Sequence, residues 1–210
     1  MCGRFTLQTP SAQIATLFDG LEISPQEPRH NICPTQNVLT VRNNDRQQLE
    51  AVMLRWGLVP FWATDLKVGA RMINARSETV FEKPSFRSAA KSKRCVIVAD
   101  GFYEWTPVAG QKKKQPWLIA RPDGSPWLMA GLWEQWKDKS SADAPVVETC
   151  TIITTAANAF ISPIHDRMPV ILQPEQVSLW LDPSFADASR LKTMLKSRAW
   201  DDFEMTKAEL

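Results

Sequence analysis

Residues 117–132 read WLIARPDGSPWLMAGL, two apolar segments on either side of the residues PDGS at 122–125. Proline, aspartate, glycine and serine are typical of tight turns, because proline presets one backbone angle and glycine accepts a positive φ. Short apolar segments bounded by such residues favour strands. The sequence therefore predicts a hairpin of Trp117–Ala120 and Trp127–Leu132.

The same pattern extends over the rest of the chain. Strands are predicted for five further segments, Asn37–Val41, Leu49–Trp56, Arg94–Ala99, Val146–Thr155 and Met168–Leu172. Helices are predicted for three, a short one capped by Ser11 with Ile14, Leu17 and Phe18 on one face, Pro174–Leu181 and Ala186–Lys196. Lys137–Pro145 is expected to be a surface loop. We expect an α+β fold, a single domain over residues 1–210 whose mostly antiparallel strands form a curved or barrel-like sheet with a few peripheral helices.

The composition indicates a folded globular protein. Of the 210 residues, 44% are apolar and 23% are charged, and nine Trp and nine Phe exclude a disordered or low-complexity chain. No apolar run approaches the roughly 18 residues of a membrane-spanning helix, and the opening MCGR lacks the features of a signal peptide. We expect a cytoplasmic protein with no membrane partner, whose cysteines at 2, 33, 95 and 150 stay as thiols.

The charge is distributed unevenly. The formal net charge is +2, but residues 1–120 carry 16 Lys and Arg against 10 Asp and Glu, whereas residues 121–210 carry 9 against 13. This distribution allows a local basic groove for an anionic polymer, but it differs from the field of a strongly basic nucleic-acid coat protein. Lys112–Lys114 is expected at a solvated hairpin tip, with weak electrostatic attraction to DNA as its functional interpretation.

Cys2 is the most informative single residue. Removal of Met1 would give it a free α-amine beside its thiol. An α-amine has an ordinary pKa of about 7.7–8.0, so a useful fraction is unprotonated at neutral pH and can attack a carbonyl. The thiol can then add to the resulting imine and close a five-membered thiazolidine ring. The alternative interpretation is an ordinary residue of a first strand.

Two other residues have neighbours that suit acid–base chemistry. His165 lies in the segment SPIHDRMP at 162–169, directly before an aspartate and an arginine. Glu104 lies between Tyr103 and Trp105, where burial would raise the pKa of its carboxyl and suit it to proton transfer. The alternatives are a solvated turn histidine and a glutamate that points to solvent.

Three residues suit the recognition of carbonyl or phosphate oxygens. Asn74 and Arg76 place an amide and a guanidinium close together, and both groups form directed hydrogen bonds to such oxygens. Arg4 follows Cys2 by two residues and can bring a phosphate toward it. A surface ion pair is the alternative interpretation of Arg4.

The segment WGLVPFW at 56–62 is rich in aromatic residues. Aromatic side chains near arginines hold unpaired bases by stacking, at about 1–3 kcal/mol per base. Most tryptophans of a small domain lie in the core, so we expect Trp56 inside and Trp62 at the surface.

A metal site is not expected. His30 and Cys33 have the spacing of two metal ligands, but no second pair occurs at similar spacing. A structural zinc needs four ligands. No other cofactor is indicated.

Six segments occur in an order typical of one known family, MCGRF at 1–5, RHNICPT at 29–35, WGLVPFW at 56–62, INARSET at 73–79, RCVIVADGFYEW at 94–105 and IHDRMPVIL at 164–172. By these segments the chain resembles the SOS-response-associated peptidase family, whose members crosslink to abasic sites in single-stranded DNA. Two features depart from the family pattern. Cys33 stands where a small residue is commoner, and the family usually continues past the last helix into a further strand and a polar segment, whereas this chain stops at Phe203–Leu210.

The resemblance implies a covalent function. Cys2, exposed by removal of Met1, would bond to the ring-opened aldehyde of the abasic sugar as a thiazolidine and shield the lesion from strand cleavage. Asn74 resembles the residue that positions the N-terminal group and the sugar, and Glu104 the residue that assists proton transfer around the amine. His165 resembles the residue that acts on the sugar during ring opening and Schiff-base exchange.

The resemblance also implies the partner. Phosphate contacts are expected for Arg4, Arg76 and Arg167, and positions near the DNA path for Trp62 and Trp105. The expected partner is single-stranded DNA containing abasic sites, bound by a monomer with no cofactor and no obligate protein partner. The protein would be associated with the nucleoid when it is bound to DNA.

Two other functions stay open at this stage. An N-terminal-nucleophile amidohydrolase is one, since Cys2 followed by Gly3 also opens glutaminase domains. A non-covalent reader of modified DNA bases is the other, with Cys2 inert and tryptophans forming a pocket. An autoproteolytic or peptidase activity of Cys2 is a variant of the crosslinking function.

Overall fold

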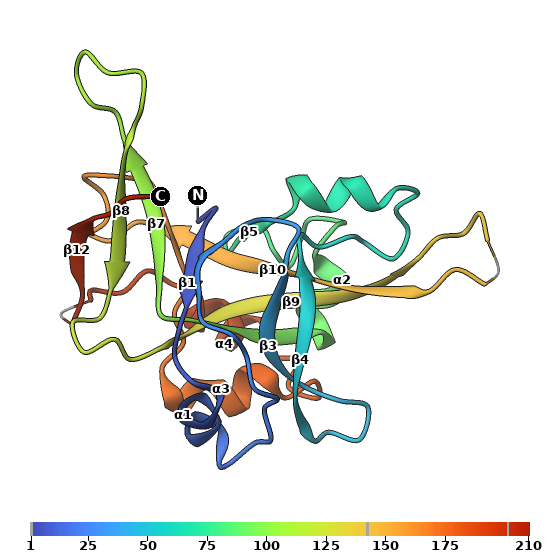
Figure 1. The fold of residues 1–210 in the computed structure, drawn as a ribbon. Helices are drawn as coiled ribbons and strands as arrows, with labels where there is room; N and C mark the ends of the chain where they lie inside the picture. The colour runs from blue at the N-terminus through green and yellow to red at the C-terminus, as the bar shows by residue number, and fades with distance from the viewer. Residues whose placement is uncertain (1, 142, 201) are drawn as a thin grey trace.

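The computed structural model of the protein describes residues 2–141, 143–200 and 202–210. The strands are β1 (Phe5–Leu7), β2 (Arg29–Ile32), β3 (Asn37–Asn43), β4 (Leu49–Trp56), β5 (Asn74–Arg76), β6 (Arg94–Ala99), β7 (Gly101–Thr106), β8 (Gln115–Ala120), β9 (Trp127–Lys137), β10 (Val146–Ala156), β11 (Arg167–Pro169) and β12 (Glu204–Lys207). The helices are α1 (Ser11–Ala15), α2 (Arg87–Ser92), α3 (Pro174–Leu181) and α4 (Ala188–Met194), with 3₁₀ turns at Thr16–Phe18 and Leu66–Arg71. Strands dominate and the helices lie at the periphery, which confirms the α+β expectation (Figure 1).

Five strands close into a barrel. Antiparallel pairs join β4 to β3, β3 to β6, β6 to β9 and β9 to β10. A parallel pair between β10 and β4, with Thr149 opposite Arg55 and Cys150 opposite Trp56, completes the ring. Closure leaves these strands without a free edge. The barrel-like sheet predicted from the sequence is therefore confirmed.

A second sheet carries the start of the chain. Its strand order is β12-β8-β7-β1-β2, and all of its pairs are antiparallel. The chain passes from the barrel into this sheet between β6 and β7, at Asp100 and Gly101. A Cβ at Gly101 would lie 2.5 Å from the Ile119 carbonyl oxygen, so only glycine allows β7 to approach β8 this closely.

The predicted hairpin of residues 117–132 is wrong. A turn does form at 122–125, where Gly124 has a φ of +69° and Ser125 N donates to Asp123 Oδ1 at 2.9 Å. However, β8 pairs with β7 and β12, whereas β9 pairs with β6 and β10. Both strands have their backbone groups paired to other strands, so the turn joins two sheets instead of two neighbouring strands.

Several predicted boundaries also differ from the structure. The strand predicted at Met168–Leu172 is Arg167–Pro169, because the residues after Pro169 leave β10 and bond to β9, where Ile171 forms a single bridge with Met129. The helix that begins at Ser11 becomes a 3₁₀ turn after Ala15, and its Leu17 is 44% exposed instead of sharing a buried face. β12 is the strand that the sequence did not predict after the last helix.

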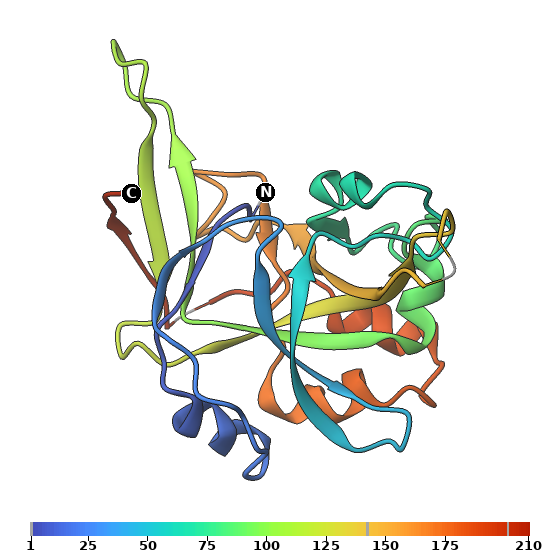
Figure 2. The same ribbon diagram turned by 45° about the vertical axis from the view of Figure 1, so that its right-hand side comes forward.

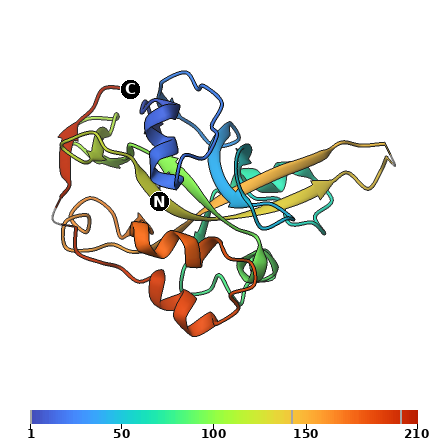
Figure 3. The same cartoon turned by 90° about the horizontal axis from the view of Figure 1, so that it is seen from below.

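Helices α3 and α4 lie together on one side of the molecule, as the view from below shows (Figure 3). Arg94 of β6 is fully buried and joins this side to the barrel: its Nε donates to the carbonyl of Trp180 at 2.6 Å, and another guanidinium nitrogen to that of Phe185 at 3.0 Å. The first bond satisfies a carbonyl at the C-terminal end of α3, where a cation is also favoured by the helix dipole, and the second holds the connection between α3 and α4.

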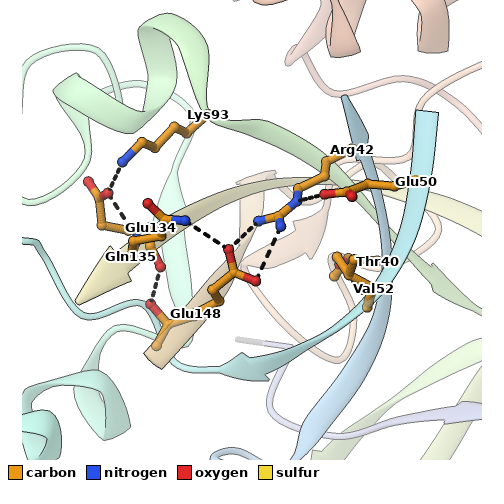
Figure 4. Close-up of polar contacts among 9 residues, drawn as sticks. Thr40, Arg42, Glu50, Val52, Lys93, Glu134, Gln135 and Glu148 are labelled. Carbon is orange, nitrogen blue, oxygen red and sulfur yellow. Dashed lines mark hydrogen bonds and ion pairs between the residues drawn. The ribbon is translucent and has the colours of Figure 1, made fainter. Parts of the chain in front are cut away.

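A polar network lies among the barrel strands (Figure 4). Arg42 of β3 donates to Glu50 of β4 at 2.7 Å and, through two nitrogens, to Glu148 of β10 at 2.9 and 3.2 Å. Its guanidinium carbon also lies 3.9 Å from the ring centroid of Trp133. Because Arg42 is nearly buried, these partners offset the cost of removing its charge from water.

No helix among the described residues is both long enough and apolar enough to cross a membrane.

Candidate active site

Strand β1 brings the start of the chain into the protein interior. Phe5 lies opposite Phe102 of β7 on one side and Ile32 of β2 on the other. Tyr103 N donates to the Arg4 carbonyl at 2.9 Å, which continues the β1–β7 pairing toward Cys2. Cys2 itself is fully buried and belongs to the hydrophobic core. The fold thus fixes the residue that the sequence analysis singled out.

Asn74 holds Cys2 directly. Its Nδ2 donates to the Cys2 carbonyl oxygen at 2.8 Å. β5, which carries Asn74, pairs in parallel with β10, with Asn74 opposite Ile152. The Oδ1 atom of Asn74 is buried, and no residue of the described part of the chain donates to it. A buried acceptor in this position is suited to an N–H group of a ligand or of the N-terminal residue.

Glu104 of β7 is the second group near Cys2. It is only 4% exposed, and burial raises the pKa of its carboxyl from 4.5 to about 7. Burial also raises the pKa of the Cys2 thiol, and the charge of Glu104 raises it further. The thiol is therefore neutral in this state, while Glu104 can both accept and release a proton near neutral pH.

His165 approaches Glu104 from the loop between β10 and β11. Its Nε2 lies 4.0 Å from Glu104 Oε2. Its Nδ1 lies 2.9 Å from both the Arg167 backbone N–H and a carboxylate oxygen of Asp166. Burial lowers the pKa of His165, which favours the neutral ring with Nδ1 accepting from Arg167. In that tautomer the proton is on Nε2, on the side of Glu104.

Four of the residues predicted from sequence therefore come together from four separate segments, Cys2, Asn74, Glu104 and His165. An amide, a carboxyl group with a near-neutral pKa and a neutral imidazole surround a residue whose thiol is protonated. Such a set can hold a carbonyl compound and move protons around it. Among the described residues, no cluster of three or more His, Cys, Asp or Glu side chains is arranged to hold a metal ion.

Comparison with known proteins places the chain in a family. The family model described as SOS response associated peptidase matches residues 1–209. The chain belongs to this family. The SOS response associated peptidase model thus spans both sheets and all four residues of the site.

Named relatives of this family are similar over most of their length. The chain is 44% identical over 207 residues to "Abasic site processing protein YoqW" of Bacillus subtilis (strain 168), covering 97% of this chain and 90% of that protein. It is 33% identical to "Abasic site processing protein YedK" of Escherichia coli (strain K12), covering 86% of this chain and 79% of that protein. A crystal structure of a protein from Bacteroides thetaiotaomicron superposes with a TM-score of 0.86 at 26% identity, covering 99% of this chain and 92% of that one.

The three arginines singled out for phosphate contacts differ in their surroundings. Arg76 is exposed and lies two residues after Asn74, on the same face of β5. Arg4 donates to Asn31 Oδ1 at 3.0 Å, and its guanidinium carbon lies 5.8 Å from the Trp105 ring centroid. The first of these is open to a phosphate, and the second forms a mixed cationic and aromatic surface beside the site.

Arg167 is held by protein groups. It is 9% exposed, donates to the two carboxylate oxygens of Glu78 at 2.7 and 2.9 Å, and donates to the Thr154 carbonyl at 2.7 Å. This bidentate pair lowers the pKa of Glu78 and joins β11 to the turn after β5. A phosphate contact of Arg167 remains a prediction, and it would have to compete with Glu78.

The tryptophans lie as the sequence suggested. Trp56 is fully buried, and its Nε1 donates to the Ile73 carbonyl at 2.9 Å, directly before Asn74. Trp62 is 46% exposed and lines a depression with Phe81 and Arg87 of the α2 region. No contact that the structure gives for the described residues joins Trp62 to Cys2, so its place on a DNA path stays a prediction.

Sequence reasoning missed the residue that anchors β1. Asp100, at the junction of β6 and β7, accepts from Gln8 N, from Thr9 N at 3.1 Å and from Thr9 Oγ1 at 2.6 Å. Asp100 lies in the same segment as Glu104, and its residue type alone indicates no anchoring role. Its partners lie more than 90 positions away in the chain, so no local pattern could have identified them.

Proposed function

We propose that this protein forms a covalent crosslink between Cys2, after removal of Met1, and the ring-opened aldehyde of an abasic site in single-stranded DNA. The observation that carries this proposal is the convergence of Asn74 and Glu104 on Cys2, the residue that would hold both the amine and the thiol. The names of the relatives, which describe abasic site processing, point to the same substrate.

The reaction balances without a cofactor. The α-amine of Cys2 attacks the aldehyde carbon, and the carbinolamine loses one water to give an imine. The thiol then adds across the C=N bond, so its proton passes to the nitrogen and a thiazolidine ring closes. Because the Cys2 thiol is protonated before reaction, the amine acts first.

Each neighbouring group has a defined task in this scheme. Glu104 takes a proton from the α-ammonium and returns it when water leaves, which a pKa of about 7 allows in both directions. Asn74 fixes the Cys2 carbonyl and offers Oδ1 to the amine. During ring opening the anomeric hydroxyl gives a proton to the carboxylate of Glu104, the sugar ring oxygen gains one from the same carboxyl group, and His165 donates a hydrogen bond from Nε2–H to that ring oxygen. Arg4, Arg76 and Arg167 supply phosphate contacts, and Trp62 and Trp105 supply stacking surfaces.

The product would shield the aldehyde from β-elimination, so the protein protects a damaged strand instead of turning over rapidly. We propose that it acts as a monomer in the cytoplasm, on DNA with an unpaired lesion. Peptidase activity, if present, would use the same Cys2 thiol.

The test uses a single-stranded oligonucleotide with one abasic site. We expect a product that survives a denaturing gel, with an intact mass equal to protein without Met1 plus DNA minus one water. Cys2→Ala and DNA whose aldehyde has been reduced should give none. A product of equal yield with Cys2→Ala would overturn the proposal.

The same set of proteins separates the two other functions. An amidohydrolase would release ammonia from glutamine and lose this activity with Cys2→Ala. A non-covalent reader would bind modified DNA equally well with and without Cys2, and no covalent mass would appear. Either result together with an absent crosslink would replace the proposal.

A further inference from the structure

A groove of about 690 Å³ lies at the outer edge of the second sheet, outside the site described above. It runs between the hairpin of β7 and β8 and the last strand, β12. Trp105, Lys113, Lys114 and Lys207 line it, together with one acidic side chain, Glu209. Three cationic side chains therefore line this groove, against the Glu209 carboxylate and the carboxylate of the last residue, Leu210.

The strand register connects the groove to the candidate active site. Glu104 lies opposite Trp117 of β8, and Trp117 lies opposite Lys207 of β12. Directly opposed residues of neighbouring strands project from the same face of a sheet. Because neighbouring strands lie about 4.8 Å apart, the Lys207 backbone is only about 10 Å from that of Glu104. Glu104, Trp117 and Lys207 thus form a row of opposed residues across β7, β8 and β12, from the candidate active site to the edge of the sheet.

The side chains in this row are held in place. Trp117 Nε1 donates to Thr106 Oγ1 at 2.8 Å, which fixes the indole ring. The Lys207 ammonium lies 5.9 Å from the centroid of that ring. A cation above an aromatic face is oriented without being neutralised, so its charge stays available to an anion.

The hairpin loop between β7 and β8 adds further positive charge. This loop projects beyond the rest of the molecule (Figure 1 and Figure 2). Lys112, Lys113 and Lys114 lie in it and are exposed, and the chain contains no Asp or Glu from Trp105 to Pro122. The expectation of a solvated lysine-rich hairpin tip is confirmed. Such a concentration of positive charge attracts an extended polyanion.

We propose that this groove binds the phosphodiester backbone of the DNA strand that flanks the lesion, through Lys113, Lys114 and Lys207. The inference rests on the proposed function, because it is the position beside Glu104 that makes a nucleic-acid strand the occupant. Trp105 follows Glu104 directly in β7, lies under the Arg4 guanidinium and lines the groove, so a strand whose damaged sugar lies at Cys2 can pass Arg4 and Trp105 and reach the hairpin. The groove would then supply affinity that does not depend on the lesion.

The test compares two variants that each remove two positive charges. Lys113→Gln with Lys114→Gln changes the groove, whereas Arg46→Gln with Lys196→Gln changes two exposed positions outside it, in the β3–β4 turn and after α4. Each protein reacts with an abasic oligonucleotide that has long flanks and with one that has a single nucleotide on each side. Lys207→Gln tests separately whether the lysine of β12, at the edge of the sheet, contacts the DNA backbone.

We expect the groove variant to bind the long oligonucleotide, with its aldehyde reduced so that no covalent product forms, about tenfold more weakly than wild type near 0.15 M salt, because each phosphate contact to a single strand contributes about 0.7 to the salt slope of log K. The slope itself should fall by about 1.4 for two contacts. On the short oligonucleotide the groove variant should crosslink as wild type does. The control variant should resemble wild type with both.

The outcomes separate this inference from the proposed function. If wild type forms no covalent product with either oligonucleotide, the proposed function fails. If wild type forms the product and the groove variant matches the control on long DNA, in affinity and in salt slope, the groove is not a DNA site. A loss of equal size on short and long DNA would also overturn the inference, because it would place the lysines at the lesion instead of the flank.

Discussion

Glu104 is the residue whose ionisation the fold alters most usefully. Burial beside the core raises the pKa of its carboxyl to about 7, whereas in the unfolded chain the value is near 4.5. Between these values the folded protein keeps a proton that the unfolded chain has lost. Its contribution to stability is therefore present in full below pH 4.5 and is lost as the pH rises through 7.

Replacing Glu104 by Gln should remove this dependence, because glutamine stays neutral at every pH. We expect the variant and wild type to have similar free energies of unfolding near pH 4.5, and the variant to be more stable by about 3 kcal/mol at pH 8. Urea denaturation at the two pH values measures the difference. A difference that does not change with pH would show that Glu104 ionises normally in the folded protein.

Asn74 offers a second test at the level of one side chain. Replacing it by Ala removes the hydrogen bond to the Cys2 carbonyl and should cost about 1 kcal/mol of stability. We also expect crosslink formation to slow by about tenfold, because the N-terminal residue is no longer oriented. Single-turnover gels measure the rate.

Asn43 provides a matched control for Asn74. Its Nδ2 donates to the Leu181 carbonyl at 3.1 Å, a bond of the same kind on the side of the molecule that carries α3. Asn43→Ala should lose similar stability and keep the rate of wild type. Equal rates for the two variants would mean that Asn74 has only a structural role.

The chemistry of the site could be predicted from residue types, whereas its contacts could not. Cys2, Glu104 and His165 were candidates because their functional groups suit aldehyde chemistry, and their convergence agrees with that reasoning. The pairing of Arg167 with Glu78 depends on how β11 and the turn after β5 meet in space. Side chains far apart in the sequence have no local signal for such a pair.

The strand β1 shows how a short element can depend on one distant side chain. It has three residues and pairs with β7 through Phe5 and Thr6. Directly after it, the backbone N–H groups of Gln8 and Thr9 both donate to the Asp100 carboxylate. This carboxylate therefore fixes the end of β1 that lies opposite to Cys2.

Asp100→Ala should free the end of β1 next to Gln8 and Thr9 from the rest of the fold. The change leaves partly buried donors without their acceptor, so we expect a loss of about 3 kcal/mol in the free energy of unfolding, together with slower crosslinking. Asp138 is the control, since it accepts from Ser140 in an exposed loop. Asp138→Ala should change neither quantity measurably. Equal stability of the two variants in thermal or urea unfolding would contradict the anchoring role.

Long, strongly apolar elements were predicted well and short ones were not. β3, β4, β6, β10 and α3 lie close to their predicted ranges, because each buries a recognisable pattern of apolar residues. β1, β2 and β5 have three or four residues, too few to show a period of two. They are strands because longer neighbours supply their hydrogen bonds, as β10 does for β5.

At the level of the whole molecule, the barrel depends on close packing around Gly131 of β9. Gly131 lies opposite Cys95 of β6 and Ile152 of β10, so three strands meet there. A Cβ at this position would lie 2.9 Å from Ile97 Cδ1 and 3.0 Å from Cys95 Sγ. These distances are shorter than ordinary carbon contacts, and the interior has no room to adjust cheaply.

Gly131→Ala should therefore destabilise the protein by about 1–3 kcal/mol through overpacking. Ile97→Val removes the methyl group that would make the closest contact. The double variant should be more stable than the sum of the two single changes predicts, which a double-mutant cycle by denaturant unfolding measures. Strict additivity would show that Ile97 does not limit the space around Gly131.

A barrel-like sheet was expected, but the pairs of strands that close the barrel could not be predicted from local patterns. An alternating strand predicts which face is buried, but the choice of partner depends on the other strands. The PDGS turn illustrates this, since its chemistry was identified correctly and its flanking strands still belong to different sheets. The parallel pair of β4 and β10 joins residues almost a hundred positions apart.

The parallel pair of β4 and β10 also determines when the barrel can form during synthesis. During synthesis β4 leaves the ribosome long before β10, so the barrel cannot close until residues near 156 have emerged, and β12 joins the other sheet later still. Until then Cys2, which is fully buried in the finished fold, is not yet enclosed by it. Removal of Met1, which the proposed function requires, would therefore be easiest during translation, and the speed of elongation would then influence how much reactive protein a cell obtains.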